Sequence, residues 1–157
     1  MADVNRAPAR SRPLLGAHES IAGGLHRAFD RLLAVGGESL QIFTANQRQW
    51  RVKPPAAEDI RLFAEKWQAC GQMPVASHGS YLINLAAADP VAAAKSIAAF
   101  ADELGRCLQL GLGFVVLHPG SHLGAGVEAG LAAVARNLDQ ALEQAGVPTT
   151  GLKVLLE

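Results

Sequence analysis

The sequence predicts an α/β fold built on a parallel sheet, and three observations support this. Short apolar stretches suited to strands alternate along the chain with longer stretches whose apolar residues recur at helical spacing. The apolar stretch 112–117 is interrupted only by Gly113, which is typical of a strand covered on both faces. Half of the 157 residues are hydrophobic and only 5% are aromatic, a composition that suits helices packed closely on a sheet.

The first part of the chain contains two predicted strands, one helix and a loop. Residues 13–18 form a short apolar segment that predicts the first strand. Apolar residues over 25–33 recur at helical spacing until Gly36, which predicts a helix that ends there. A second strand is expected over 39–44, and the polar segment 45–55 after it is a loop closed by two prolines.

The rest of the chain repeats this alternation. Asp89 precedes Pro90, and an acidic cap before a proline at the first helical position favours a helix start. The further predicted elements are helices over 58–70, 90–110 and 127–144 and strands over 74–78, 112–117 and 152–157. Strands that alternate with helices in this way predict right-handed crossovers and a parallel sheet.

This alternating order is that of a TIM (β/α)₈ barrel, but a complete barrel needs about 250 residues. The sequence therefore predicts a truncated barrel of about five parallel strands and four helices over residues 14–157. An unpaired edge at the fifth strand would favour association with another chain. Residues 1–13 carry three arginines and two prolines without an apolar stretch, which predicts a disordered N-terminal extension.

The composition excludes several functional classes. Fourteen basic and fourteen acidic residues cancel, so nucleic-acid binding requires a local basic patch. No apolar run approaches the roughly 20 residues that span a bilayer, so we expect no membrane partner. Cys70 and Cys107 lie without a pattern inside helical stretches, which favours two reduced core thiols and a cytoplasmic protein.

Three predicted strands end on residues that can bind a metal. His78 and Glu157 end the third and fifth strands, and His118 follows the fourth. Adjacent parallel strands lie about 4.8 Å apart, so the three side chains can converge on one ion. Two imidazoles and a carboxylate suit Zn²⁺ with one position left for water. Taken singly, each histidine could instead be a hydrogen-bonded polar group and Glu157 a chain terminus, and spacing alone leaves both interpretations open.

Four motifs, in order, make the chain resemble a known family. They are Gly16-Ala-His-Glu-Ser-Ile-Ala-Gly-Gly24, Phe43-Thr-Ala-Asn-Gln-Arg-Gln-Trp50, His78-Gly-Ser-Tyr-Leu-Ile-Asn-Leu85 and His118-Pro-Gly-Ser-His122. Over residues 14–157 the sequence resembles the N-terminal part of endonuclease IV, the zinc-dependent apurinic/apyrimidinic endonuclease family of base-excision repair. The resemblance implies a TIM barrel that binds double-stranded DNA and hydrolyses the phosphodiester 5′ to an abasic site with zinc-activated water.

The resemblance also implies roles for five residues. His78 and His118 match two histidines that bind one zinc of a three-zinc cluster. Glu157 stands at the place of a glutamate that bridges two zincs, which makes it the catalytic candidate. Arg48 and Tyr81 match an arginine and a tyrosine that enter the DNA at the lesion. Without the motifs, Arg48 would be interpreted as a solvated loop residue and Tyr81 as a partly packed one.

The family's other zinc ligands lie in a C-terminal half that this sequence does not contain. We therefore expect one largely complete zinc site and little or no activity from this chain alone. Two alternatives stay open. A xylose-isomerase-like sugar isomerase would share the strand-end ligands, but this function would not explain the segment Asn46–Trp50. A non-catalytic DNA-binding remnant would keep Arg48 and Tyr81 and would bind DNA without metal.

Overall fold

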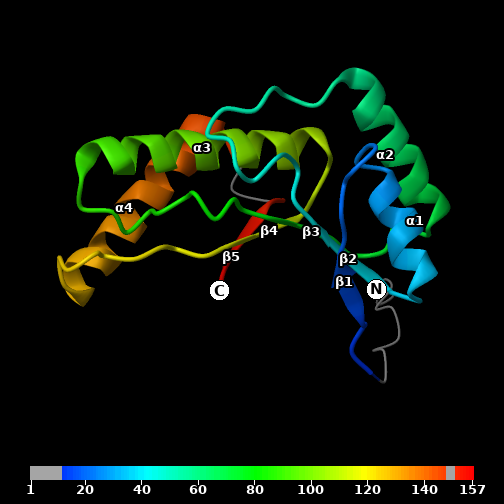
Figure 1. Ribbon diagram of the computed structural model, residues 1–157, viewed down its shortest axis with the longest axis horizontal. Coiled ribbons are helices and arrows are strands. Elements are labelled where there is room, and N and C mark those ends of the chain that lie inside the picture. Colours follow the sequence, from blue (N-terminus) through cyan, green and yellow to red (C-terminus); the bar gives the residue numbers. More distant parts are fainter. Residues whose placement is uncertain (1–11, 148–150) are drawn as a thin grey trace, which may run out of the picture.

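The computed structural model describes residues 12–147 and 151–157 (Figure 1). Its elements in chain order are β1 (Gly16–His18), α1 (Arg27–Ala34), β2 (Ser39–Ile42), α2 (Ala57–Ala69), β3 (Val75–His78), α3 (Pro90–Gln109), β4 (Phe114–Leu117), α4 (Val127–Ala145) and β5 (Lys153–Leu156). The predicted alternation of five strands and four helices is confirmed. Most of the extension expected over 1–13, residues 1–11, lies outside the described residues.

The five strands form one parallel sheet in which each strand pairs with the next strand along the chain. The spatial order is β1-β2-β3-β4-β5. The register aligns His78 with Val116 and Leu117 with Leu156. Because all strands run in one direction, their carboxyl ends lie along one edge of the sheet, and the loops that follow them meet there.

All five strands are shorter than predicted, and at two of them the flanking residues are engaged elsewhere. The amide of Leu112 donates to the carbonyl of Cys107 at 2.9 Å, so Leu112 belongs to the turn that ends α3. The strand β4 therefore begins only at Phe114. Thr44 follows β2, which ends at Ile42, and its side chain hydrogen-bonds to a residue of α3.

The hydrophobic core lies between the helices and one face of the sheet. Figure 1 shows the four helices arranged around the sheet, with the opposite side of the strands left open. Large side chains that are fully buried include Phe29, Phe63, Phe100, Leu104, Ile42, Val115 and Leu117. None of the helices in the described ranges has the length and apolarity to cross a membrane.

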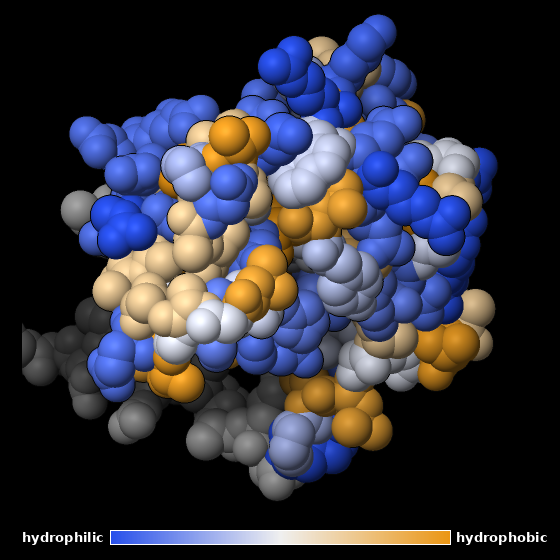
Figure 2. Space-filling view, turned by 60° about the vertical axis from the view of Figure 1, so that its left-hand side comes forward, coloured by the Kyte–Doolittle hydropathy of each residue, from blue (hydrophilic) through white to orange (hydrophobic). Residues whose placement is uncertain are grey.

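The open face of the sheet corrects one prediction. Phe114 on β4 is 38% exposed, and Leu155 on the neighbouring β5 is exposed as well. The expectation that strand 112–117 is covered on both faces is therefore wrong for this face in the described residues. An apolar side chain here suits the interior of a barrel, where it meets side chains from the strands opposite. Figure 2 shows hydrophobic and hydrophilic residues interspersed on one face of the molecule.

Candidate metal and nucleic-acid site

Three side chains from neighbouring strand ends converge at the loop edge of the sheet. His78 is the last residue of β3, and His118 and Glu157 directly follow β4 and β5. One ligand atom of each residue lies within 4.8 Å of those of the other two. Successive strand side chains alternate between faces, so the register places all three residues on the open face of the sheet.

Backbone hydrogen bonds hold these strand ends in place. The amide of Glu157 donates to the carbonyl of Leu117 at 3.1 Å, which continues the pairing of β4 and β5 one residue beyond the strand. The amide of Gly79 donates in the same way to the carbonyl of Val116 at 2.7 Å. The sheet itself thus sets the separation of the three candidate ligands.

The two histidines face the same carboxylate oxygen. His78 Nε2 lies 3.4 Å from Glu157 Oε2, and His118 Nε2 lies 3.9 Å from that oxygen. His78 is buried, and its Nδ1 lies 2.8 Å from the Gly79 carbonyl, which can only accept a hydrogen bond. A proton on Nδ1 leaves the lone pair of Nε2 directed at the site, as a metal-binding histidine requires.

The site is open to solvent on one side. The side chains of His118 and Glu157 are 46% and 61% exposed, whereas that of His78 is buried. His78 is therefore a buried candidate ligand, whereas His118 and Glu157 are exposed ones at the rim of the site. This combination leaves room for a substrate group beside a bound cation.

Tyr81 stands over the site and makes ring contacts with both histidines. Its ring stacks on that of His118, with centroids 5.8 Å apart and an interplanar angle of 20°. Its centroid lies 5.5 Å from that of His78. The residue is nevertheless 65% exposed, so Tyr81 is a surface residue beside the candidate ligands and is not packed in the core.

A second group of rings continues the site toward β1. The ring of Phe43 lies 4.4 Å from that of His18 and 5.5 Å from that of His78, measured between centroids. His18 Nδ1 lies 2.9 Å from Gln41 Oε1, so it donates to that side-chain carbonyl on the neighbouring strand. His18 thus lines the floor of the site and is fixed by β2.

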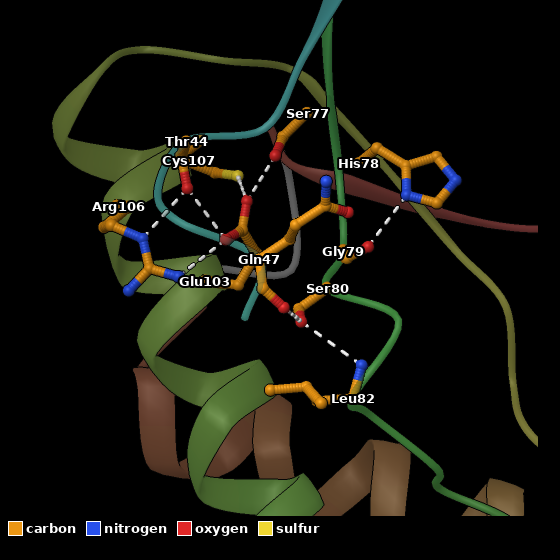
Figure 3. A network of polar contacts seen from close by, with 10 residues as sticks. All are labelled: Thr44, Gln47, Ser77, His78, Gly79, Ser80, Leu82, Glu103, Arg106 and Cys107. Atoms are coloured by element: carbon orange, nitrogen blue, oxygen red, sulfur yellow. Dashed lines mark hydrogen bonds and ion pairs between the residues drawn. The ribbon is translucent and has the colours of Figure 1, made fainter. Parts of the chain in front are cut away.

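Arg48 lies apart from the three ligands, on the loop after β2. Its backbone amide donates to Asn46 Oδ1 at 3.0 Å, which shapes the turn that carries it. In residues 12–147 and 151–157 its guanidinium makes no hydrogen bond or ion pair, and the residue is exposed. The Ser80 hydroxyl donates to the Gln47 carbonyl at 2.8 Å and so ties this loop to the loop that carries Tyr81 (Figure 3).

A buried polar network that sequence analysis did not identify supports the site from below (Figure 3). The carboxylate of Glu103 on α3 accepts hydrogen bonds from Thr44 Oγ1 at 2.7 Å, from Arg106 Nη2 at 2.6 Å and from Ser77 Oγ. Arg106 Nε also donates to Thr44 Oγ1 at 2.9 Å. Ser77 directly precedes His78, so α3 is bonded to the strand end that bears a candidate ligand.

The comparisons with known sequences identify one family and one recurring name. A family model described as "Xylose isomerase-like TIM barrel" matches residues 29–157. A protein named "Probable endonuclease 4" from Nitratidesulfovibrio vulgaris (strain DP4) is 50% identical over 140 residues, which are 89% of this chain and 49% of that protein. One of the same name from Geobacter sp. (strain M21) is 47% identical over 144 residues, 92% of this chain and 50% of that protein. The chain thus spans about half the length of the curated relatives it matches.

Solved structures agree with these sequence matches. The crystal structure of endonuclease IV from Thermus thermophilus matches with a TM-score of 0.81 and 34% identity, over 92% of this chain and 51% of that chain. A D-tagatose 3-epimerase-like protein matches with a TM-score of 0.62 and 17% identity, over 88% of this chain and 51% of that chain, and shows the fold alone. These matches confirm the resemblance carried by the four motifs.

Proposed function

The chain belongs to the xylose isomerase-like TIM barrel family, and we propose that it acts in DNA repair as a metal-dependent endonuclease of the endonuclease IV type. The proposed reaction is hydrolysis of the phosphodiester 5′ to an abasic site in double-stranded DNA. The observation that carries the proposal is the convergence of His78, His118 and Glu157 beneath the exposed ring of Tyr81.

The donor set suits zinc. Two imidazole nitrogens and one carboxylate are ligands that Zn²⁺ takes in catalytic sites, with a further position left open. The Nδ1–H of His78 is occupied by the Gly79 carbonyl, so Nε2 is the nitrogen available to a cation. Bound Zn²⁺ supplies Lewis acidity, which polarises a phosphodiester and makes water a better nucleophile near neutral pH.

We propose that Glu157 also contacts a second cation. Both histidines approach its Oε2, so its Oε1 is used by neither of them. The side chain is largely exposed and can meet a phosphate region from the solvent side. We therefore keep Glu157 as the proposed catalytic residue and as the third metal ligand.

Arg48 and Tyr81 are the proposed DNA contacts. The exposed guanidinium of Arg48 is accompanied on the same loop by two further exposed basic residues, Arg51 and Lys53. Such a patch can contact phosphates although the net charge of the chain is zero. The exposed ring of Tyr81 can stack on a base beside the gap that a missing base leaves.

The number of metal sites limits the expected rate. Within the described ranges, His78, His118 and Glu157 form the one group of three suitable ligands. A three-zinc cluster needs ligands beyond these, so we expect specific binding to abasic DNA and at most weak incision from this 157-residue chain. β5 is an edge strand of the described sheet, so association with a second polypeptide at this edge is also part of the proposal.

Incision of a labelled duplex tests the proposal. The duplex carries one abasic site, and the reaction contains the chain with zinc, with a chelator, or with the His118→Ala variant. Zinc-dependent incision 5′ to the lesion that the variant loses would support the proposal. Equal affinity for abasic and undamaged duplex, together with no incision, would contradict it.

Two free cysteines support a cytoplasmic location for this activity.

A further inference from the structure

Asn84 joins the loop after β3 to the loop after β4. Its Nδ2 donates to the Ser121 carbonyl at 3.0 Å, and its Oδ1 accepts from the Ser121 amide at 3.0 Å and the Ala86 amide at 3.1 Å. Two amide donors facing Oδ1 fix the orientation of the side-chain amide. One side chain thus pairs with both backbone groups of Ser121, as a neighbouring strand would.

The two loops are in close contact at this point. Gly120 has a φ of +106°, and a Cβ there would overlap Asn84 Oδ1. The Ala86 amide also donates to the Pro119 carbonyl at 3.2 Å. The backbone amide of Asn84 donates to the buried hydroxyl of Ser96 at 3.0 Å, which anchors the joint to α3.

The two loops joined by Asn84 each carry one residue of the candidate site. Tyr81 lies three residues before Asn84, and His118 lies three residues before Ser121. The two rings stack on each other at the rim, where Tyr81 is largely exposed and lies against the rings of the site rather than in the core. The relative position of the loops therefore decides where the ring of Tyr81 stands.

We propose that Asn84 is a positioning residue for lesion binding, because its pairing with Ser121 holds Tyr81 against His118. The inference rests on the proposed function and extends it to a residue outside the ligand group. Asparagine suits the role since one short side chain must both donate and accept. Aspartate lacks the donor, and its carboxylate would face the Ser121 carbonyl.

The first test measures binding to a duplex that carries one tetrahydrofuran abasic analogue, in chelator so that no incision occurs. Asn84→Ala and Asn84→Asp should each bind about tenfold more weakly than the parent chain, as the loss of the side-chain hydrogen bonds to Ser121 predicts. In a Tyr81→Ala background the same substitutions should cause no further loss. Each variant is measured at a temperature at which circular dichroism shows it folded.

Asn137→Ala is the matched control. Asn137 Nδ2 donates to the Leu85 carbonyl at 2.8 Å, so it holds the same loop from α4 without joining it to the loop after β4. This variant should keep its affinity for the abasic analogue within about twofold while its thermal midpoint falls. A tenfold loss for Asn84→Ala that persists in the Tyr81→Ala background would assign Asn84 a purely structural role and overturn the proposal.

A second test is independent of DNA and metal. The ring-proton resonances of His118, assigned with His118→Ala, should shift in Asn84→Ala and Asn84→Asp and stay unchanged in Asn137→Ala, because Tyr81 stacks on that ring. Unchanged resonances in both Asn84 variants would overturn the proposed joint. If the parent chain does not distinguish abasic from undamaged duplex, the proposed function fails. The resonances then still test whether Asn84 holds Tyr81 against His118.

Discussion

His78 Nε2 and Glu157 Oε2 lie 3.4 Å apart although β4 stands between the strands that carry them. Strands two positions apart in a sheet are separated by almost 10 Å, so both side chains must lean toward the middle strand to meet. His118 Nε2 lies 3.9 Å from the same oxygen of Glu157. Because the side chains lean inward, one cation could contact all three residues.

Removal of the carboxylate should abolish tight zinc binding. Glu157→Gln keeps the shape of the side chain but loses the charge that offsets the cation, so we expect zinc affinity to fall by more than about 100-fold. Competition with a chromophoric chelator measures this. The control is Glu128→Gln, an exposed acid in the first turn of α4, and equal affinities in the two variants would argue against a ligand role for Glu157.

Arg48 should govern part of the salt dependence of DNA binding. Arg48→Ala removes one proposed phosphate contact, so the slope of log K against log salt should decrease in magnitude by about 1. Fluorescence anisotropy at several salt concentrations gives the slope. Arg61→Ala removes another exposed arginine, which Glu58 and Glu65 already pair on α2, and it should leave the slope unchanged. An equal decrease of the slope in both variants would show that binding depends on the overall positive charge and not on Arg48 itself.

Glu103 should be important for stability as well as for the site. Glu103→Gln leaves Arg106 buried without its carboxylate partner, which costs about 3–5 kcal/mol in the free energy of unfolding. Urea denaturation followed by circular dichroism measures the change. Glu65→Gln breaks an exposed ion pair on α2 and should cost less than about 1 kcal/mol. A comparable loss in both variants would show that the network contributes nothing beyond surface charge.

The two cysteines should differ in reactivity. Burial, followed by the nearby carboxylate of Glu103, raises the pKa of the Cys107 thiol well above its ordinary value. In native protein at about pH 8, iodoacetamide should therefore modify the half-buried Cys70 and spare Cys107. Mass spectrometry of labelled peptides distinguishes the two thiols, and rapid labelling of Cys107 would contradict its burial.

The raised pKa of Cys107 also affects stability. Unfolded chains lose the Cys107 thiol proton near pH 9 whereas folded ones keep it, so the raised pKa predicts that stability falls as pH rises above 9.

The exposed apolar residues on the open face should promote association. Leu155 on β5 pairs with Val116, two residues along β4 from Phe114 on the same face, and both Leu155 and Phe114 are exposed in the described residues. Leu155→Lys should therefore shift the chain toward monomer at micromolar concentration, as sedimentation velocity can measure. Leu131→Lys changes an exposed leucine on α4 instead and serves as the control. A monomeric parent chain would rule out association through this face.

Local sequence patterns predict the strand ends and the convergence of the three candidate ligands. His78, His118 and Glu157 each close an apolar stretch, and parallel strands bring such positions to one edge whatever the details of packing. The same patterns cannot reveal Glu103. It meets Thr44 across 59 residues of sequence, and an acid three residues before an arginine on a helix is typical of a solvated surface. Periodicity likewise could not distinguish the open face at Phe114 from a covered one, because an apolar strand residue suits either.

Each strand of the described sheet pairs only with its neighbours in chain order, and this order has a consequence for folding. His118 follows His78 by 40 residues, and Glu157 follows His118 by 39, so each added strand and helix brings one more ligand to the edge. The complete ligand set exists only after the last strand has docked. A cation that binds all three residues therefore binds the fully assembled sheet and not its earlier stages. Its binding free energy stabilises the docked position of the last strand.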